Sequence, residues 1–195
     1  INHNDLVLME PYLKMIDQEN KRLENLVENI LQNSMLDNKG LLWEGGPVDI
    51  AALGARVIET AKFRVRSEKY DLTFECANTP VFIKAKESHL RSVISNLVDN
   101  AIKYSPQPAK IQLSIKQNID TVVLKVSDKG IGIKKEHQSK IFDNLYRVPT
   151  GDLHDVKGFG LGLNYVKKVC DGYGWKLNVT STFGKGTTFE ITTRK

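Results

Sequence analysis

The sequence predicts an α+β protein: a two-layer α/β sandwich of helices on a sheet, preceded by a long helix. Apolar residues recur at helical spacing in four segments and alternate with polar residues in the predicted strands. Strands also occur as neighbours joined by short turns, at 110–117 with 121–127 and at 175–180 with 187–192. A doubly wound parallel sheet would alternate each strand with a helix, so these adjacent hairpins favour the α+β class.

Composition limits the classes of function. The chain has 195 residues, of which 41% are hydrophobic and 26% charged, which is typical of a globular protein with a substantial core. The net charge is +5, with lysines and arginines scattered rather than grouped with aromatics, so we expect no nucleic-acid surface. Cys76 and Cys170 lack metal-binding spacing, which favours reduced thiols in a cytosolic protein. No apolar run suits a membrane span, but a chain that starts at Ile1 suggests a fragment, which leaves room for a membrane segment upstream.

The first predicted unit is residues 1–44. Residues 1–9 have an irregular pattern, and a helix is expected from about Pro11 to Asp37. Its narrow apolar stripe contains Leu13, Ile16, Leu23, Val27 and Ile30. Such a stripe favours a partner helix, through self-association or a companion helix, over packing against the chain's own domain. The sequence 38–40 ends the helix, and a boundary at 45–47 opens the second unit, 45–195.

The second unit alternates helices and strands. The expected elements are a short strand at 48–50, a helix at 51–67, strands at 71–76 and 81–84 around the turn 78–80, a helix from Glu87 that ends at 105–108, the hairpin 110–117/121–127, an irregular stretch at 128–158, a helix at 161–170, and the hairpin 175–180/187–192.

The helix that starts near Glu87 has one apolar and one polar face. The apolar face carries Leu90, Ile94, Leu97, Val98, Ala101 and Ile102; the polar face carries His89, Ser92, Asn96, Asn100 and Lys103, with Tyr104 at its edge. Asparagine is a poor helix former because its amide competes for backbone hydrogen bonds. Two asparagines followed by a lysine therefore suggest a wall for a polar ligand, the alternative being an ordinary solvated face.

Two glycine clusters suggest contacts with a ligand. Asp128 follows a strand, where its carboxylate can accept hydrogen bonds from an amino group, and Gly130 and Gly132 allow a ligand to approach the backbone; a plain turn has the same pattern. The glycines of 158–162 open a helix, where exposed amides can cradle phosphate. They alternate, unlike a Walker A loop, and 184–187 is interpreted as a hairpin turn.

Between the clusters, about two dozen residues without a core pattern suggest a mobile cover. Arg147 and Lys157 could reach a triphosphate from this cover. The alternative is a surface loop with two solvated cations.

The order of these segments resembles that of the sensor histidine kinases and, more broadly, the gyrase-type ATP-binding fold. The segments 96–105, 128–133, 142–147 and 158–163 look like the family's N, G1, F and G2 boxes, and 184–189 is similar to its final glycine-threonine block. The resemblance implies a Bergerat-type fold, a mixed sheet with helices on one face. It also implies that the helix 11–37 is the second helix of a dimerisation and phosphotransfer domain, of which 1–44 is a remnant.

The resemblance also implies roles for individual residues. Asp128 would bind the adenine amino group near Thr187, Tyr104 would pack beside the base, Asn100 would coordinate Mg²⁺, and Arg147 would stabilise the transferring phosphoryl group as the catalytic residue. The ATP-binding set implied in this way is Asn96, Asn100, Lys103, Tyr104, Asp128, Gly130, Gly132, Ile133, Tyr146, Lys157, Gly158, Phe159, Gly160, Leu161, Gly162 and Thr187.

The implied function is donation of the ATP γ-phosphoryl group to a histidine, for relay to a response-regulator aspartate. The implied partners are the parent's own acceptor helix, a response-regulator receiver domain and a second copy of the chain, in a parent anchored in the inner membrane. None of His3, His89, His137 and His154 has the family's acceptor context, so the acceptor is expected outside this chain. A nucleotide-dependent binding module without kinase activity, and a coiled-coil adaptor, are the alternatives.

Two departures from the family pattern stand out. Leu145 lies where the family often has a second phenylalanine, and Tyr173-Gly174 replaces a common His-Gly pair.

Overall fold

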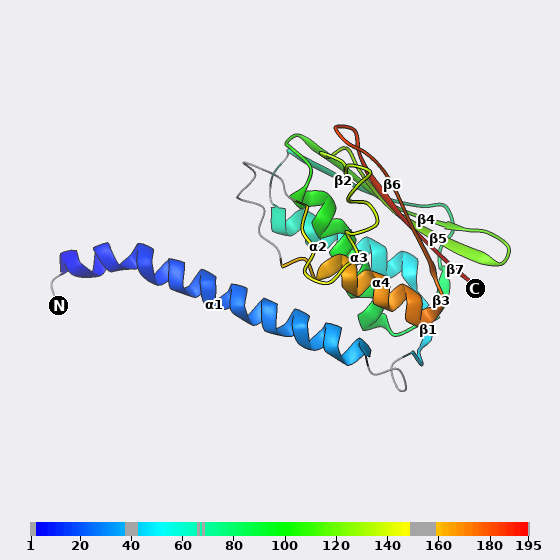
Figure 1. The fold of residues 1–195 in the computed structure, drawn as a ribbon, viewed down its shortest axis with the longest axis horizontal. Coiled ribbons are helices and arrows are strands. Elements are labelled where there is room, and N and C mark those ends of the chain that lie inside the picture. Colours follow the sequence, from blue (N-terminus) through cyan, green and yellow to red (C-terminus); the bar gives the residue numbers. More distant parts are fainter. Residues whose placement is uncertain (1–2, 38–42, 66, 68, 149–158, 195) are drawn as a thin grey trace.

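A long helix, α1 (His3–Asp37), projects from a two-layer domain in the computed structural model (Figure 1). The structure describes residues 3–37, 43–65, 67, 69–148 and 159–194. The predicted start of α1 at Pro11 is wrong, because the helix begins at His3 and Pro11 lies inside it. Residues 6–10 contain no turn-forming residue, and the helix continues through Pro11 although proline removes one helical hydrogen bond and crowds the preceding turn. Within the described ranges, no helix combines the length and apolar character that a membrane span requires.

Five strands form the main sheet in the order β2-β4-β5-β7-β6. Their bounds are β2 Tyr70–Cys76, β4 Ala109–Gln117, β5 Thr121–Asp128, β6 Lys176–Thr182 and β7 Gly186–Arg194. The β2–β4 pair is parallel and the other three pairs are antiparallel, so the sheet is mixed, as the resemblance implies. The pairing of Asp128 with Thr187 at the end of the β5–β7 ladder brings these two predicted site residues side by side.

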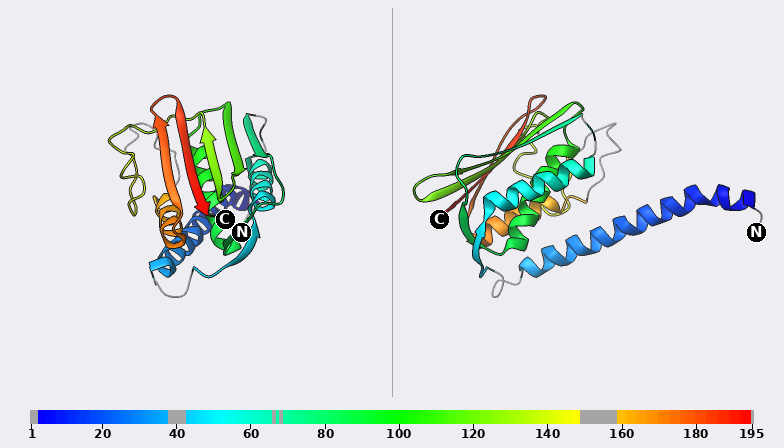
Figure 2. Two further views of the ribbon diagram at one scale, coloured as in Figure 1. Left: turned by 90° about the vertical axis from the view of Figure 1, so that its right-hand side faces the viewer. Right: turned by 180° about the vertical axis from the view of Figure 1, so that it is seen from behind.

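Three helices cover one face of this sheet, as Figure 2 shows: α2 (Ile50–Val65), α3 (Glu87–Lys103) and α4 (Gly162–Tyr173). The core lies between the two layers. In β5, Val122, Leu124 and Val126 are at most 2% exposed, whereas Lys125 is exposed on the opposite face. This alternation confirms the predicted α+β sandwich.

A smaller two-stranded ribbon joins β1 (Gly46–Asp49) to β3 (Phe82–Ala85). The two strands on either side of the turn 78–80 do not pair with each other. β2 pairs with β4, and β3 pairs with β1. A parallel pair needs a crossover connection, and here β3 and α3 lie within the connection from β2 to β4.

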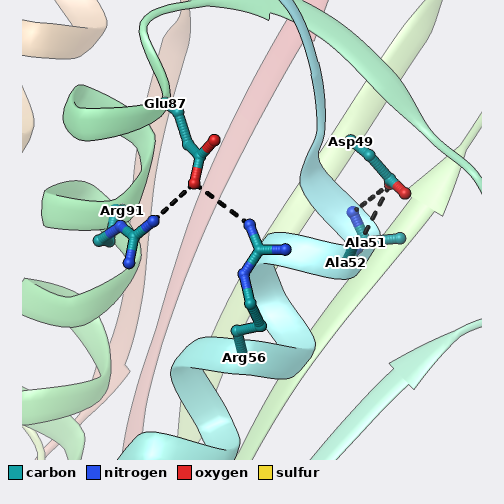
Figure 3. A network of polar contacts seen from close by, with 6 residues as sticks. All are labelled: Asp49, Ala51, Ala52, Arg56, Glu87 and Arg91. Atoms are coloured by element: carbon teal, nitrogen blue, oxygen red, sulfur yellow. Dashed lines mark hydrogen bonds and ion pairs between the residues drawn. The ribbon is translucent and has the colours of Figure 1, made fainter.

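Ion pairs join the neighbouring helices α2 and α3 (Figure 3). Glu87 at the start of α3 accepts hydrogen bonds from Arg56 of α2 (3.2 Å) and from Arg91 (2.6 Å). Arg64 and Asp99 form a second pair between the two helices. Asp49 caps α2 by accepting hydrogen bonds from the amides of Ala51 and Ala52.

The end of α1 packs against α4, while most of its apolar stripe faces outward. Leu36 is 6% exposed, whereas Leu23, Val27 and Ile30 are between 49% and 57% exposed. The alternative that the stripe packs along the chain's own domain is therefore wrong for these described side chains.

The predicted polar-face position of His89 is also wrong. His89 is only 9% exposed because the rings of Trp43 and Tyr173 lie against it, each with its centroid 5.8 Å from that of the imidazole.

Candidate functional site

A cavity of about 390 Å³ opens between α3, the end of β5, the segment 131–148 and the β6–β7 hairpin. Eight of the predicted site residues line it: Asn100, Tyr104, Asp128, Gly132, Ile133, Tyr146, Arg147 and Thr187. Apolar neighbours such as Ile141, Leu163 and Phe189 form much of the remaining wall. The cavity therefore offers a largely apolar space with a few polar groups, the usual character of a small-molecule site.

Asp128 holds a fixed position at the end of β5. Its Oδ1 accepts hydrogen bonds from the amides of Gly130 (2.8 Å) and Thr187 (3.2 Å). Among the described residues, none donates to Oδ2, so this oxygen can accept a hydrogen bond from a ligand in the cavity. Burial raises the pKa of the Asp128 carboxyl, and the two amides only partly oppose that effect.

The turns beside Asp128 depend on glycine. Gly132 has φ +66°, and a Cβ there would lie 2.1 Å from the carbonyl oxygen of Thr182. Gly186 has φ +121°, and its Cβ would lie 2.1 Å from the backbone oxygen of Asp128. The amide of Gly184 donates to the oxygen of Ile131 at 2.7 Å. The Asp128 turn and the β6–β7 turn thus pack backbone to backbone, which only glycine permits.

Thr187 lies beneath this turn and is 7% exposed. Its hydroxyl oxygen lies 2.9 Å from that of Ser181, which also accepts a hydrogen bond from the amide of Ile133 at 2.8 Å. This network ties the last two strands to the turn that follows Asp128. Sequence reasoning did not identify Ser181, because a serine in a strand carries no recognisable signal.

The polar face of α3 is less fixed than this turn. Asn100 and Tyr104 line the cavity, whereas Lys103 is exposed outside its lining. Asn96 also lies outside the lining, and its amide donates to the carbonyl of Ser92 at 2.9 Å. Its Oδ1 approaches the start of α4 so closely that a Cβ on Gly162 would lie 2.6 Å away.

The segment 134–148, expected as part of a mobile cover, makes specific contacts. The hydroxyl of Tyr146 lies 2.7 Å from Nδ1 of His137, and both residues line the cavity. The side-chain amide of Asn164 in α4 donates to the oxygen of Phe142 at 2.9 Å. His137 is a site residue that sequence reasoning missed, since no motif links it to Tyr146.

The start of α4 approaches this segment. Gly160 has φ +72°, and a Cβ there would lie 2.8 Å from the backbone of Leu145 and Tyr146. Leu161 precedes the first helical residue, Gly162, and provides no side-chain cap. Backbone amides at such a helix start can bind anions. Lys157 and Gly158 lie outside the described residues, and Phe159 is half-buried.

Residues 85–195 match the family model of histidine kinase-, DNA gyrase B- and HSP90-like ATPases. The match covers more than half of the chain, so the chain belongs to this family of ATPases. Sensor protein RprX of Bacteroides fragilis is 39% identical over 179 residues, which make up 91% of this chain and 34% of RprX. Sensor protein SrrB of Staphylococcus aureus is 32% identical over 183 residues, or 92% of this chain and 30% of SrrB. The chain thus spans about a third of the length of these curated relatives.

Solved structures show the same architecture. The mycobacterial sensor histidine kinase MprB is 25% identical, with a TM-score of 0.66 over 77% of this chain and 97% of that chain. ShkA in complex with AMPPNP (23% identical, TM-score 0.80, 93% of this chain and 38% of that one) shares the fold. ThkA in complex with the response regulator TrrA shares the fold as well, with 24% identity and a TM-score of 0.74 over 96% of this chain and 51% of that chain. Within its family, the chain carries the ATP-binding catalytic domain of two-component sensor histidine kinases.

Proposed function

We propose that the cavity binds Mg·ATP as the phosphoryl donor of a histidine autokinase. The observation that carries this proposal is the fixed Asp128 carboxylate, which lines an apolar cavity together with Asn100 and Arg147. A flat base fits between apolar walls, and its amino group can donate to the carboxylate, which keeps an oxygen available. Thr187 and Tyr104 border the same space.

The phosphates would extend toward α3 and the start of α4. The amides around Gly160, Leu161 and Gly162 would bind them, as helix starts bind anions. Asn96 and Lys103 would approach from α3, and Lys157, Gly158 and Phe159 precede this helix start in the chain. Gly130, Gly132, Ile133 and Tyr146 would shape the base side of the cavity.

Asn100 is the proposed magnesium ligand. Its neutral amide oxygen suits a cation that prefers oxygen and keeps water and phosphate in its shell. The structure supports this fit because Asn100 projects from α3 into the cavity lining. Bound Mg²⁺ would neutralise charge on the phosphates during transfer.

In the proposed reaction, a histidine nitrogen attacks the γ-phosphorus, the bond to the β,γ-bridging oxygen breaks, and ADP leaves. Arg147 would stabilise the charge on the transferring group, which needs positioning and charge neutralisation more than covalent help. The acceptor histidine would belong to a helix outside this chain, paired with α1 in the longer parent.

The parent's partners follow from the same proposal. The outward apolar stripe of α1 supports a helical bundle with a second copy and the acceptor helix. The ThkA–TrrA complex supports a response-regulator receiver domain as the next phosphoryl acceptor. An anchor in the inner membrane would lie in the parent, and we propose units at 1–44 and 45–195.

Two measurements test the proposal. Calorimetry on this chain should show ATP binding that strengthens with Mg²⁺; no binding would overturn the proposal. The full-length protein should take label from γ-labelled ATP onto histidine, and Arg147→Ala should lose this label while ATP affinity changes less than threefold. Binding without any label in the full-length protein would favour a nucleotide-dependent binding module instead.

A further inference from the structure

Gln138 joins the start of the segment 134–148 to the β6–β7 hairpin. Its side-chain amide donates hydrogen bonds to the carbonyl oxygens of Ile133 (2.9 Å) and Ser181 (3.0 Å). Ser181 belongs to β6, a strand of the main sheet. Because Gln138 follows His137 directly, the backbone of His137 is held next to a fixed part of the domain.

The far end of this segment rests on the start of α4. The side-chain amide of Asn164 donates to the oxygen of Phe142 at 2.9 Å, and the backbone of Leu145 lies against Gly160. Leu145 has φ +61°, a left-handed conformation that is rare for a bulky residue. Such a conformation persists only when the surrounding structure holds it. The turn just before Tyr146 therefore depends on the contacts of its neighbours.

A hydrogen bond between Tyr146 and His137 connects the two ends of the segment. The Tyr146 hydroxyl lies 2.7 Å from Nδ1 of His137. The His137 side chain is only 18% exposed, and both side chains line the cavity. Arg147 follows Tyr146 directly and lines the same cavity. The bond therefore fixes the residue next to the backbone from which Arg147 extends.

Ring packing alone does not account for the contact between His137 and Tyr146. The ring planes are tilted by 45° with their centroids 6.2 Å apart, which matches neither a stacked nor an edge-to-face pair. The 2.7 Å between the hydroxyl oxygen and Nδ1, in contrast, is a good hydrogen-bond distance. The polar atoms of the pair, rather than the ring faces, therefore define the contact.

We propose that His137 is a positioning residue whose hydrogen bond to Tyr146 holds Arg147 at the cavity. Gln138 fixes the imidazole on one side, and the left-handed turn at Leu145 directs the tyrosine toward it on the other. The ordering of this segment stands by itself, and its consequence for phosphoryl transfer rests on the proposed function. In this role His137 does not touch the transferring group, because it acts through its neighbour across the turn.

Hydrogen exchange of residues 139–148 in the nucleotide-free chain tests the ordering. His137→Leu removes the hydrogen bond but keeps a bulky side chain, whereas His137→Asn places a side-chain amide near the position of Nδ1. We expect exchange at least fivefold faster in His137→Leu and within twofold of the wild type in His137→Asn. Equally fast exchange in both variants would assign the contact to ring packing and overturn the proposal, as would unchanged exchange in His137→Leu.

Tyr146→Phe provides an independent variant if His137→Leu folds poorly. It should accelerate exchange by the same factor, and combining the two substitutions should have no further effect, because both remove one bond. Tyr173→Phe is the matched control, since its hydroxyl lies 3.1 Å from Nδ1 of His89 outside the cavity lining. It should leave the exchange of residues 139–148 unchanged. Additive acceleration in the double variant, or equal acceleration in the control, would contradict the proposal.

Labelling kinetics test the consequence for Arg147. In the full-length protein, His137→Leu should lower the rate of histidine labelling at saturating ATP at least tenfold, with KM for ATP raised no more than fivefold, and His137→Asn should retain most of the rate. A raised KM with an unchanged saturating rate would overturn the positioning of Arg147. If this chain binds no ATP while exchange still accelerates in His137→Leu, the proposed function fails and the ordering role of His137 stands.

Discussion

At the β5 end of the cavity, Asp128 is held by two backbone amides, and the surrounding turns pack without side chains between them. At the other end, α3 presents the side chain of Asn100 to the cavity, with the exposed Lys103 outside the lining. The first end is rigid because backbone atoms form it. The second is adjustable because amide and ammonium groups on flexible side chains form it. A ligand with a flat base and a variable phosphate chain suits such a division.

The largest effect should come from breaking the rigid end with Gly132→Ala. The new Cβ would meet the Thr182 carbonyl in a left-handed conformation, so we expect a loss of about 3 kcal/mol in the free energy of unfolding, above the ~1–2 kcal/mol that the conformation alone costs. Gly174→Ala is the matched control, because Gly174 has a similar φ of +68° but a Cβ added there would have nothing within 4 Å. Urea denaturation measures both variants. Equal losses of unfolding free energy in the two variants would show that the Thr182 backbone gives way to the new Cβ at little cost.

Next in size is Asp128→Asn, which tests the role of the carboxylate at the rigid end. Asparagine can keep both backbone hydrogen bonds through Oδ1 while it turns a donor toward the ligand amino group. We expect ATP to bind about 2 kcal/mol more weakly, the scale of a hydrogen bond to a charged group, as measured by calorimetry. Since burial raises the pKa of Asp128, the charge is unfavourable in the empty protein, and the variant should unfold no more easily. Asp71→Asn, at an exposed strand position, is the control that should change nothing.

The adjustable end is tested by Asn100→Ala. If Asn100 is the magnesium ligand, its loss should remove the Mg²⁺ dependence of ATP binding and weaken Mg·ATP binding about tenfold, or ~1.4 kcal/mol. Titrations with and without Mg²⁺ should then coincide. Retained Mg²⁺ dependence would place the cation elsewhere and would leave the side-chain amide of Asn100 with a structural role only.

Sequence reasoning performed differently at the two ends. The position of Asp128 followed from its place at a strand end, and its neighbour Thr187 from the final motif, because both lie in regular, strongly alternating strands. His137 was missed as a site residue, and His89 was placed on the wrong face, because ring contacts with Tyr146 and Tyr173 join residues from different elements. Helical spacing describes one element at a time, so it cannot predict that aromatic rings from other elements will bury a residue such as His89. The start of α1 was missed for a different reason, since a proline inside a long helix resembles a helix start.

The raised pKa of Asp128 predicts how ATP binding at the rigid end depends on pH. ATP needs the ionised carboxylate of Asp128, and its raised pKa means that the proton binds at higher pH than it would to an ordinary aspartate. Affinity should therefore fall severalfold as the pH is lowered toward that raised pKa, before an aspartate with the usual value of 3.8 would respond. Calorimetry across this range tests it, and Asp128→Asn should give a flatter profile. An equally steep profile in the variant would assign the titration to the phosphates.

The smallest effect should come from Tyr146→Phe, which removes the hydroxyl that bonds His137. The two rings stay close, with centroids 6.2 Å apart, so packing is kept and only the hydrogen bond is lost. We expect ATP binding to weaken by about 1 kcal/mol, the net value of one hydrogen bond. Tyr70→Phe is the control, since its hydroxyl bonds the exposed Gln107 away from the cavity. If Tyr146→Phe matches this control, the contact with His137 does not order the cover, and the adjustable end of the cavity includes the whole segment 134–148.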